Sequence, residues 1–564
     1  MTSAPEVIHY SDLWQGIARA VPDRPAIITA DDVWSYGRLA REAGAFACHL
    51  QDAGVRAGDA VALLLYNRAE YLAVYWACLA IGAAPVAINY RYRSGEVAAL
   101  LTDCGAKLLV TAASLAPTAV DAVAAAGTGI PIVTVTDDAA FDVAATGTHT
   151  TGYAEIIARG GSLPASAPRG AELRLYTGGT TGMPKGVVWD LDTLLEARRA
   201  STWGILGIDP PTDLAAAIDI AVDPATPRIR TLPLPPLLHG TAQSTTMGTL
   251  ALGGTVVLQT GASLDVTEAV RLARMHEVTR IVVAGDAVAL PFVEAVERSG
   301  AGLRHLGSVM SSGMRFSDDV KRRLHALGEV MIVDLLASSE GGPFAFGITR
   351  SAADLPARFM PTPETVLLDA ERNEVPREPG ALGILAFGGV LPKGYHGDPV
   401  KTAQAFPVIR GHRYVVPGDW ARARDDGSIE LLGRGSAVVN TGGEKVFPAE
   451  VEEALLQHPS VADAVVFGVP DPRFGEVVSA AVVPEPGARV DPAALAAHVD
   501  GLLAGYKKPR HYLVRESLDR SQTGKVDLER LRAEAIRSAE AVRDAEAIRN
   551  AGRTAEEAQL STRP

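Results

Sequence analysis

The sequence predicts an α/β protein with more than one domain, and three observations carry this prediction. The chain has 564 residues, which is several times the ~100–200 residues of a typical domain. Helix-like and strand-like patterns alternate through its N-terminal part, as is typical of a parallel sheet with helices on both faces. Hydrophobic residues make up 47% and charged residues 21% of the chain, which is the balance of an ordinary globular protein with large cores.

The first elements follow one another closely along the chain. We expect helices over Leu13–Ala20 and Tyr36–Ala53, because their apolar residues recur at helical spacing. We expect strands over Pro25–Thr29 and Ala60–Leu65, which are short apolar runs.

An uncharged stretch follows over Tyr71–Ile88 and has to be tested against a membrane span. It is rich in Ala, and Gly82 and Pro85 interrupt it. A span needs about 20 consecutive apolar residues in one helix. The stretch therefore predicts a buried helix that runs into a core strand.

The middle of the chain varies in character. The segment Asp209–Arg230 is rich in Pro and Asp and is interpreted as a long loop. Leu303–Val333 alternates between helix and strand patterns again. Short apolar runs with Gly and alternating charge over Gly380–Gly389 and Arg413–Leu432 predict a smaller antiparallel region.

A boundary is expected near Arg434–Ser436, and a small α+β domain follows it. Its predicted elements are a helix over Glu450–His458 and strands over Val461–Val469, Ser479–Val483 and Tyr512–Arg515.

The C-terminal tail repeats AEAIRS, AEAVRD and AEAIRN from Ala533 to Asn550. A period of six residues does not match the ~3.6 residues of a helical turn, so no apolar stripe forms. We expect a frayed helix or disorder over residues 533–564.

Charge and cysteine content exclude some classes of function. The formal net charge of −13 disfavours binding to a phosphate backbone, so no nucleic-acid partner is expected. The three cysteines, Cys48, Cys78 and Cys104, are far apart and lack the spacing of a metal site, which predicts reduced thiols. No N-terminal signal pattern is present, and we expect a cytoplasmic protein.

The strongest local motif is LYTGGTTGMPKG, residues 175–186. Three glycines and three threonines occupy Thr177–Gly182. Glycine lets backbone amides approach an anion, hydroxyls add donors, and Lys185 adds a positive charge, so the segment predicts a phosphate-binding loop. It is not a Walker A loop, because it lacks the Gly-Lys-Ser/Thr ending at the required spacing.

This loop resembles the signature of the adenylate-forming superfamily, which includes acyl-CoA synthetases, luciferases and peptide-synthetase adenylation domains. Further segments resemble the motifs of that family in the same order along roughly residues 10–530. The motif sequences resemble those of bacterial fatty-acyl-CoA synthetases most. They are Pro235–Gly240, Ala337–Glu340, Gly394–Tyr395, Pro417–Asp419, Gly433–Arg434, Gly442–Pro448 and Thr523–Lys525.

The resemblance implies a particular architecture. It is a large N-terminal domain over residues 1–433, made of two α/β subdomains and a small β-barrel region. A hinge at 434–436 and a small mobile α+β domain at 437–532 follow. Ser436 stands where relatives often carry Asp or Lys at the hinge.

The resemblance also implies two steps, adenylation of a carboxylic acid by ATP and transfer of the acyl group to a thiol. Lys525 would bridge the carboxylate and the α-phosphate during adenylation, and Thr181 would act beside it. Glu340 would hold Mg²⁺, which prefers hard oxygen ligands and bridges phosphates. The lead-in to Lys525 departs from the family pattern, since Asp519 replaces a proline while Arg520 is kept.

The nucleotide is expected to contact several motifs. Asp419 and Arg434 resemble the ribose-binding pair, and a carboxylate suits a vicinal diol because it accepts two hydrogen bonds. Leu336 and Ala337 replace the usual Tyr and Gly, so the adenine pocket is expected to differ. The expected nucleotide contacts are Thr177, Gly178, Gly179, Thr180, Thr181, Gly182, Lys185, Ser312, Gly313, Met314, Asp334, Ser339, Asp419, Arg434 and Lys525.

The acyl and thiol sites follow from the same resemblance. His239 would lie between the acyl and phosphate sites as a gate, and Asp286 is expected to cap a helix at Ala287. Lys507 and Lys508 are candidates for the nucleotide phosphates of coenzyme A, although adjacent lysines are more often solvated. The expected acyl pocket is His239, Ala284, Gly285, Asp286, Ser311, Leu336 and Ala337, and the expected thiol tunnel is Gly442, Gly443 and Glu444.

The small and apolar pocket residues favour a hydrophobic acid, either a fatty acid or a bulky polycyclic, terpenoid or steroid-like acid. No acidic residue follows His239 closely, which disfavours an amino-acid substrate. ATP, Mg²⁺ and coenzyme A are the expected cofactors, and a homodimer is possible. The alternatives are an acyl-AMP ligase that loads a carrier protein, a non-catalytic relative that binds acyl-adenylates, and a luciferase-like oxygenase.

Overall fold

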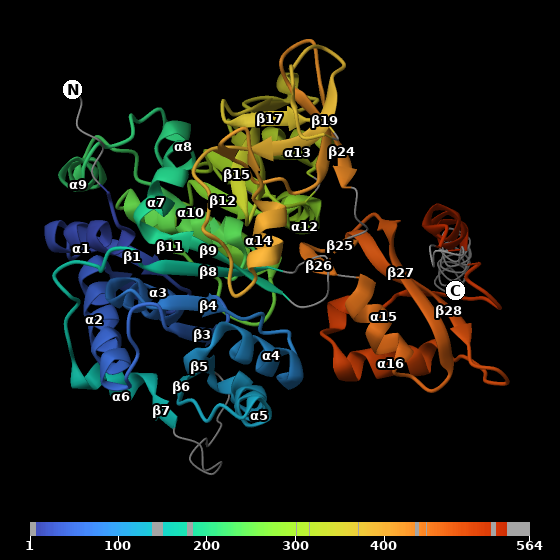
Figure 1. Ribbon diagram of the computed structural model, residues 1–564. Helices are drawn as coiled ribbons and strands as arrows, with labels where there is room; N and C mark the ends of the chain where they lie inside the picture. Colours follow the sequence, from blue (N-terminus) through green and yellow to red (C-terminus); the bar gives the residue numbers. More distant parts are fainter. Residues whose placement is uncertain are drawn as a thin grey trace, which may run out of the picture. The chain divides into compact units, whose positions relative to one another are not determined.

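The computed structural model describes residues 7–137, 150–177, 184–300, 302–314, 316–369, 371–434, 439–446, 448–519 and 526–538. The described residues up to 434 form one compact unit, and those from 439 onward form a second. Each unit has its own sheets and cores, and each is described by itself (Figure 1). No helix among the described residues is long and apolar enough to cross a membrane.

The first α/β layer of the larger unit is a parallel sheet in the order β4-β3-β5-β6-β7. Alternate residues of β3 (Ala60–Leu64) enter two different cores, so helices cover both faces (Figure 1). Val61 and Leu63 pack with α2 and α3, while Ala60 and Ala62 pack with α4 and α5. The elements are α2 (Tyr36–Asp52), α3 (Ala69–Ile81), β4 (Ala84–Ala87), α4 (Ser94–Cys104), β5 (Ala106–Ala112), α5 (Ala116–Ala126), β6 (Ile132–Val135), β7 (Thr150–Gly152) and α6 (Tyr153–Arg159).

The uncharged stretch after Tyr71 forms the predicted buried helix and core strand. Every residue of α3 except Glu70 is buried. Gly82 ends α3 in the left-handed conformation, with φ +74°, and β4 follows at once.

A second, larger sheet runs in the order β18-β17-β19-β23-β24-β16-β15-β14-β13-β12-β10-β11-β1-β2. The strands from β14 to β1 are parallel, and the strand predicted over Pro25–Thr29, β1, joins this sheet rather than the first one. Helices α11, α12 and α13 pack on one face, while α10 packs on the other. These elements are α1 (Tyr10–Ala20), β1 (Pro25–Ile28), β2 (Val33–Ser35), β10 (Arg230–Pro233), α10 (Gly240–Ala251), β11 (Thr255–Val257), α11 (Val266–Met275), β12 (Arg280–Val283), α12 (Gly285–Ser299), β13 (Ser308–Ser312), α13 (Asp318–Ala326) and β14 (Met331–Ser338).

The predicted antiparallel region continues this large sheet from β15 onward. Its strands enclose a core of Phe344, Leu367, Leu385, Phe387 and Ala421. They are β15 (Gly341–Thr349), β16 (Phe359–Pro361), β17 (Thr365–Leu368), β18 (Glu374–Val375), β19 (Leu382–Phe387), β23 (Asp419–Ala423) and β24 (Ile429–Arg434), with the separate pair β21 (Val408–Ile409) and β22 (His412–Arg413).

The prediction of a long loop over Asp209–Arg230 is wrong for part of that segment. Helix α9 (Leu214–Val222) lies inside it, and Arg230 already begins β10. The Asp213 side chain accepts a hydrogen bond from the Ala216 amide and so caps the helix.

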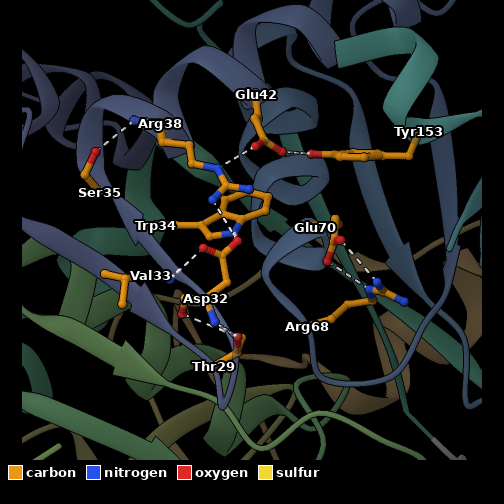
Figure 2. A network of polar contacts seen from close by, with 10 residues as sticks. All are labelled: Thr29, Asp32, Val33, Trp34, Ser35, Arg38, Glu42, Arg68, Glu70 and Tyr153. Carbon is orange, nitrogen blue, oxygen red and sulfur yellow. Dashed lines mark hydrogen bonds and ion pairs between the residues drawn. The ribbon is translucent and has the colours of Figure 1, made fainter. Parts of the chain in front are cut away.

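A polar network ties α2 to α6 within the larger unit (Figure 2). Arg38 contacts Asp32 at 2.7 Å and Glu42 at 2.9 Å, and its guanidinium lies 4.3 Å from the centre of the Trp34 ring. The Tyr153 hydroxyl donates to the other oxygen of Glu42 at 3.0 Å. Burial raises the pKa of the Glu42 carboxyl, and the two donors offset part of that rise.

The second unit is a five-stranded sheet with helices on both faces. Ala464 and Val466 of β27 pack with α15 and α16, while Val465 and Phe467 pack with the helix over residues 528–538. Residues 533–538, which the sequence assigns to the tail, belong to this last helix, and Ala535 is fully buried. The other elements are β25 (Val439–Thr441), β26 (Glu444–Val446), α15 (Pro448–Leu456), β27 (Val461–Asp471), β28 (Gly475–Pro484), α16 (Pro492–Leu502) and β29 (His511–Val514).

Candidate active site

The signature loop is carried by an antiparallel hairpin. Strands β8 (Glu172–Thr177) and β9 (Lys185–Asp190) are in register so that Thr177 lies opposite Lys185. Short strand β20 (Gly394–Tyr395) adds to β9 and places Tyr395 opposite Val187. The loop residues Gly178, Gly179, Thr180, Thr181 and Gly182 lie outside the described residues, so their predicted phosphate contacts stay predictions.

Glu340 is held at a tight turn beside this hairpin. Strands β14 and β15 are antiparallel and pair Ser338 with Gly341, so Ser339 and Glu340 form the connecting turn. The Tyr395 hydroxyl donates to Oε1 of Glu340 at 3.0 Å. The Trp189 indole of β9 donates to the Ser339 carbonyl at 3.0 Å. Two motifs that are 150 residues apart in sequence therefore meet in one place.

The charges at this place suit a polyanion. The Lys185 ammonium lies 5.3 Å from the centre of the Tyr395 ring. Burial and the nearby Lys401 cation lower the pKa of Lys185, while Asp398 and Glu340 raise it. Lys401, in α14 (Pro399–Ala405), itself pairs with Asp398 at 3.2 Å. A bound phosphate would stabilise the Lys185 ammonium, because the anion offsets the repulsion from Lys401.

The donor set at Glu340 fits Mg²⁺. Among the described residues no group of three or more His, Cys, Asp or Glu converges as a metal site. Mg²⁺ is commonly held by one or two carboxylates together with substrate phosphates and water, and Glu340 with a triphosphate would supply that combination. The Tyr395 hydroxyl would orient the carboxylate from behind, as partners of metal ligands do.

The carboxyl ends of the parallel strands bring the predicted pocket residues together. Strands β12, β13 and β14 are adjacent, with Val283 opposite Ser311 and Ser311 opposite Asp334. The buried Ser311 hydroxyl accepts a hydrogen bond from the Gly285 amide at 3.1 Å, so it satisfies a donor at the start of α12. Ligands of open α/β sheets bind at this edge.

The predicted capping role of Asp286 is wrong. Helix α12 begins at Gly285, which places Asp286 inside its first turn. The carboxylate instead accepts a hydrogen bond from the Ser317 amide at 2.9 Å. Asp286 therefore joins the segment before α13 to the first turn of α12.

Asp334 forms an ion pair that sequence reasoning missed. Lys321 of α13 lies 2.9 Å from it, and the two side chains are only 3% and 6% exposed. Burial raises the pKa of Asp334 to about 6, although Lys321 acts to lower it. A contact between Asp334 and the adenine amine remains a prediction, and it would have to share the carboxylate with Lys321.

The predicted gate residue lies at the start of α10. His239 is the N-cap residue of that helix, and its carbonyl accepts the Gln243 amide at 3.0 Å. The preceding segment is fixed from the other layer, because Asn67 accepts the Leu237 amide at 2.7 Å and donates to the Pro235 carbonyl at 3.3 Å.

The remaining nucleotide residues described by the structure lie on β13, β23 and β24 of the same sheet or directly after them. Asp419 of β23 is opposite Arg434 of β24 in the antiparallel register, so the predicted ribose pair sits on neighbouring strands. Ser312 is buried at the end of β13, Gly313 is exposed with φ +85°, and Met314 is half-buried.

The second unit holds the predicted thiol tunnel. Gly442 and Gly443 form the β25–β26 turn with φ of +58° and +90°, and Glu444 is buried after it. Lys507 does not fit the suggested role toward coenzyme A. It is buried and pairs with Glu450 at 2.8 Å, whereas Lys508 is half-buried and pairs with Asp500 at 3.6 Å. Lys525, the predicted bridging lysine, and Ser436, at the predicted hinge, lie outside the described residues.

An α/β frame that brings Lys185, Lys401 and Glu340 together beside the strands that flank a phosphate-loop motif is typical of a nucleotide-binding protein. The model of the AMP-binding enzyme family matches residues 14–396, and that of its C-terminal domain matches residues 450–525. The chain therefore belongs to the AMP-binding enzyme family, and the predicted adenylate-forming resemblance is confirmed.

Curated relatives cover almost the whole chain. A medium/long-chain-fatty-acid–CoA/3-oxocholest-4-en-26-oate–CoA ligase of Mycobacterium tuberculosis is 37% identical over 92% of this chain and 95% of its own length. The medium-chain acyl-CoA ligase Mig of Mycobacterium avium is 34% identical over 93% and 97%. The solved structure of the amide bond synthetase McbA from Marinactinospora thermotolerans has a TM-score of 0.74 at 24% identity and covers 93% of this chain and 99% of its own. The last similarity confirms the predicted fold class.

Proposed function

We propose that this chain is an ATP-dependent acyl-CoA synthetase for a hydrophobic carboxylic acid. In the first step a carboxylate oxygen of the acid attacks the α-phosphorus of ATP, and pyrophosphate leaves with the electron pair of the broken P–O bond. In the second step the deprotonated thiol of coenzyme A attacks the acyl carbon, and AMP leaves with that carboxylate oxygen.

The meeting of Lys185 and Glu340 at Tyr395 is the observation that carries this proposal. The first reaction brings an anionic carboxylate toward an anionic triphosphate, so the site has to neutralise charge and fix geometry. Lys185 and the loop before it would hold phosphate oxygens, and Lys401 would add a second cation. Mg²⁺, when bound with Glu340, would supply further positive charge on the phosphates.

The mobile lysine completes the proposed chemistry. Lys525 would bridge the carboxylate and the α-phosphate only as charge develops, with Thr181 beside it and His239 between the acyl and phosphate sites. Asp419 and Arg434 would bind the ribose hydroxyls. After adenylation, Gly442, Gly443 and Glu444 would line the path of the pantetheine thiol.

The acid itself is proposed from the pocket and the relatives. Ala284, Gly285, Ser311, Leu336 and Ala337 are small or apolar, which suits a large hydrophobic acid. The named relatives act on fatty acids, and one of them also acts on a steroid acid. Straight medium or long fatty acids and the 3-oxo steroid acid are therefore the substrates to test first.

A panel of acids tests the proposal. Purified protein with ATP and Mg²⁺ is offered fatty acids of several lengths, the 3-oxo steroid acid and amino acids, and pyrophosphate release is measured with and without coenzyme A. We expect release with hydrophobic acids, and AMP and acyl-CoA in equal amounts when coenzyme A is present. A holo carrier protein that accepts the acyl group better than coenzyme A would reassign the acceptor. Pyrophosphate release with none of the acids would overturn the function.

A further inference from the structure

Helix α1 packs against both α3 and α10 in one core, and buried side chains of α3 and α10 carry polar atoms that have no hydrogen-bond partner in the part of the chain that the structure describes. The Tyr75 hydroxyl, Oε1 of Gln243 and the Thr246 hydroxyl have none among the described residues. All three side chains are buried, with at most 4% of their surface exposed. A buried polar atom without a partner destabilises the folded state, and three of them together cost a sizeable part of the stability of a typical protein. Such atoms call for a bound partner.

The positively charged guanidinium of Arg198 lies near these buried side chains. The Arg198 guanidinium donates to the Met247 sulfur at 3.2 Å. A thioether is a weak acceptor, and no carboxylate of the described residues lies within ion-pair distance of Arg198. Arg198 also lies close to two buried hydroxyls, since a hydrogen bond and the charge of Arg198 oppose the rise that burial causes in the pKa of Tyr10, and its charge opposes that rise for Tyr75. Its donors therefore meet a thioether and neutral hydroxyls but no carboxylate of the described residues.

Gln243, Thr246 and Met247 lie on α10, the helix that starts at the predicted gate. His239 caps α10, Gln243 follows one turn later, and Met247 follows one turn after that. At ~1.5 Å per residue, the contact between Met247 and Arg198 lies about 12 Å along the helix from His239. Gln243 also faces Tyr71, one turn from Tyr75 on α3, which connects the members of the group.

We propose that Arg198, Tyr75, Gln243 and Thr246 form a polar subsite that binds an oxygen atom of the acid, a ketone or hydroxyl about 12 Å from the reacting carboxylate. The inference rests on the proposed function and specifies its substrate class. Arg198 and the two hydroxyls supply donors to such an oxygen, and Oε1 of Gln243 accepts from a hydroxyl. A site built to hydrogen-bond a substrate oxygen rejects the analogue that lacks it, because its own buried groups then stay unpaired.

The test compares two acids in several variants. A straight-chain acid that carries a ketone about 12 Å along its extended chain from the carboxylate, and the same acid without that oxygen, are used as substrates, and the ratio of their kcat/KM values is measured. We expect the wild type to favour the oxygenated acid, Tyr75→Phe to lower the ratio about 3- to 10-fold, and Arg198→Met to lower it about 10- to 100-fold. Tyr36→Phe is the control at another buried tyrosine. The Tyr36 hydroxyl donates to the Leu250 and Gly254 carbonyls at 3.1 and 2.8 Å, so the ratio should not change.

Calorimetric binding of both acids without ATP separates this inference from the proposed function. If the wild type releases no pyrophosphate but binds the oxygenated acid more tightly, and Arg198→Met removes that preference, the function fails while the subsite stands. If the wild type turns over or binds both acids equally and the variants leave the ratio unchanged, the subsite is wrong. Thermal unfolding gives a second check. Tyr75→Phe removes an unpaired hydroxyl and should keep the wild-type Tm, whereas a clear fall would show that internal water satisfies this group instead.

Discussion

Replacing Tyr395 by Phe tests the link between the hairpin and the carboxylate at Glu340. The substitution removes only the hydroxyl that donates to Glu340 at 3.0 Å. The ring that lies 5.3 Å from the Lys185 ammonium stays in place. A hydrogen bond to a charged group contributes about 1.5–3 kcal/mol, which corresponds to about 10- to 150-fold in a binding constant. Because Glu340 is half-buried, we expect the lower end, about 10-fold.

The measurement is the dependence of pyrophosphate release on free Mg²⁺ at saturating ATP and acid. We expect Tyr395→Phe to need about 10-fold more Mg²⁺ for half-maximal rate, and to recover most of its rate at high Mg²⁺. Tyr176→Phe is a suitable control, because its hydroxyl donates to Asp103 at 2.6 Å rather than to Glu340. An unchanged Mg²⁺ requirement in a folded Tyr395→Phe enzyme would refute the reasoning that Tyr395 orients a metal ligand.

Three further predictions concern the lysine, the tunnel and the buried pair. Lys525→Ala should lower the rate of adenylation by several orders of magnitude while ATP binding changes little, as measured by single-turnover kinetics and calorimetry; near-normal pyrophosphate exchange would contradict it. Gly443→Trp should spare adenylation and block thioester formation relative to Gly443→Ala, which shares the strain at φ +90° without the bulk; equal loss of both steps would argue against a tunnel there. Lys321→Met should destabilise the fold by about 3–5 kcal/mol at neutral pH. Burial already raises the pKa of Asp334 to about 6, so its stabilising contribution is present below its unfolded pKa and is lost as the pH rises through 6. Without Lys321 the pKa of Asp334 rises further, so the variant loses more stability than the wild type does as the pH rises beyond 6. Its deficit in Tm should therefore grow from pH 5 to pH 8, and a deficit that shrinks would contradict this. The double variant Lys321→Met/Asp334→Leu should recover much of the loss.

Local patterns predicted the layered architecture, because the residues of a strand alternate between its two faces and their hydrophobicity shows whether each face is buried. The apolar run of β3 is buried on both faces, and its neighbours Ala60 and Val61 enter separate cores. The strand predicted over Val461–Val469 also packs against helices on both of its faces in the second unit, which the structure and not the sequence analysis shows. The local pattern does not determine which sheet a strand joins. Strand β1, for example, pairs with β11 in the large sheet.

The wrong predictions and the missed contacts have physical explanations. Asp213 was taken for a loop residue because Asp and Pro dominate its surroundings, yet it is the cap that starts α9. Lys507 and Lys508 are adjacent in sequence, a pattern typical of exposed lysines. Lys507 is nevertheless buried, because it forms an ion pair with Glu450, which is 57 residues away in sequence. The contact of Tyr395 with Glu340 likewise joins residues 55 apart. Periodicity and motif spacing report local structure, so such tertiary pairs had no signal in the sequence beyond the Gly394–Tyr395 motif itself.

The fate of the carboxylate oxygen tests the proposed chemistry most directly. An acid labelled with ¹⁸O in both carboxylate positions is turned over with ATP and coenzyme A, and the AMP is analysed by mass spectrometry. Attack of the carboxylate on the α-phosphorus predicts one ¹⁸O atom in each AMP and none in the pyrophosphate. Unlabelled AMP, or label in inorganic phosphate, would contradict an acyl-adenylate and with it the account of this site.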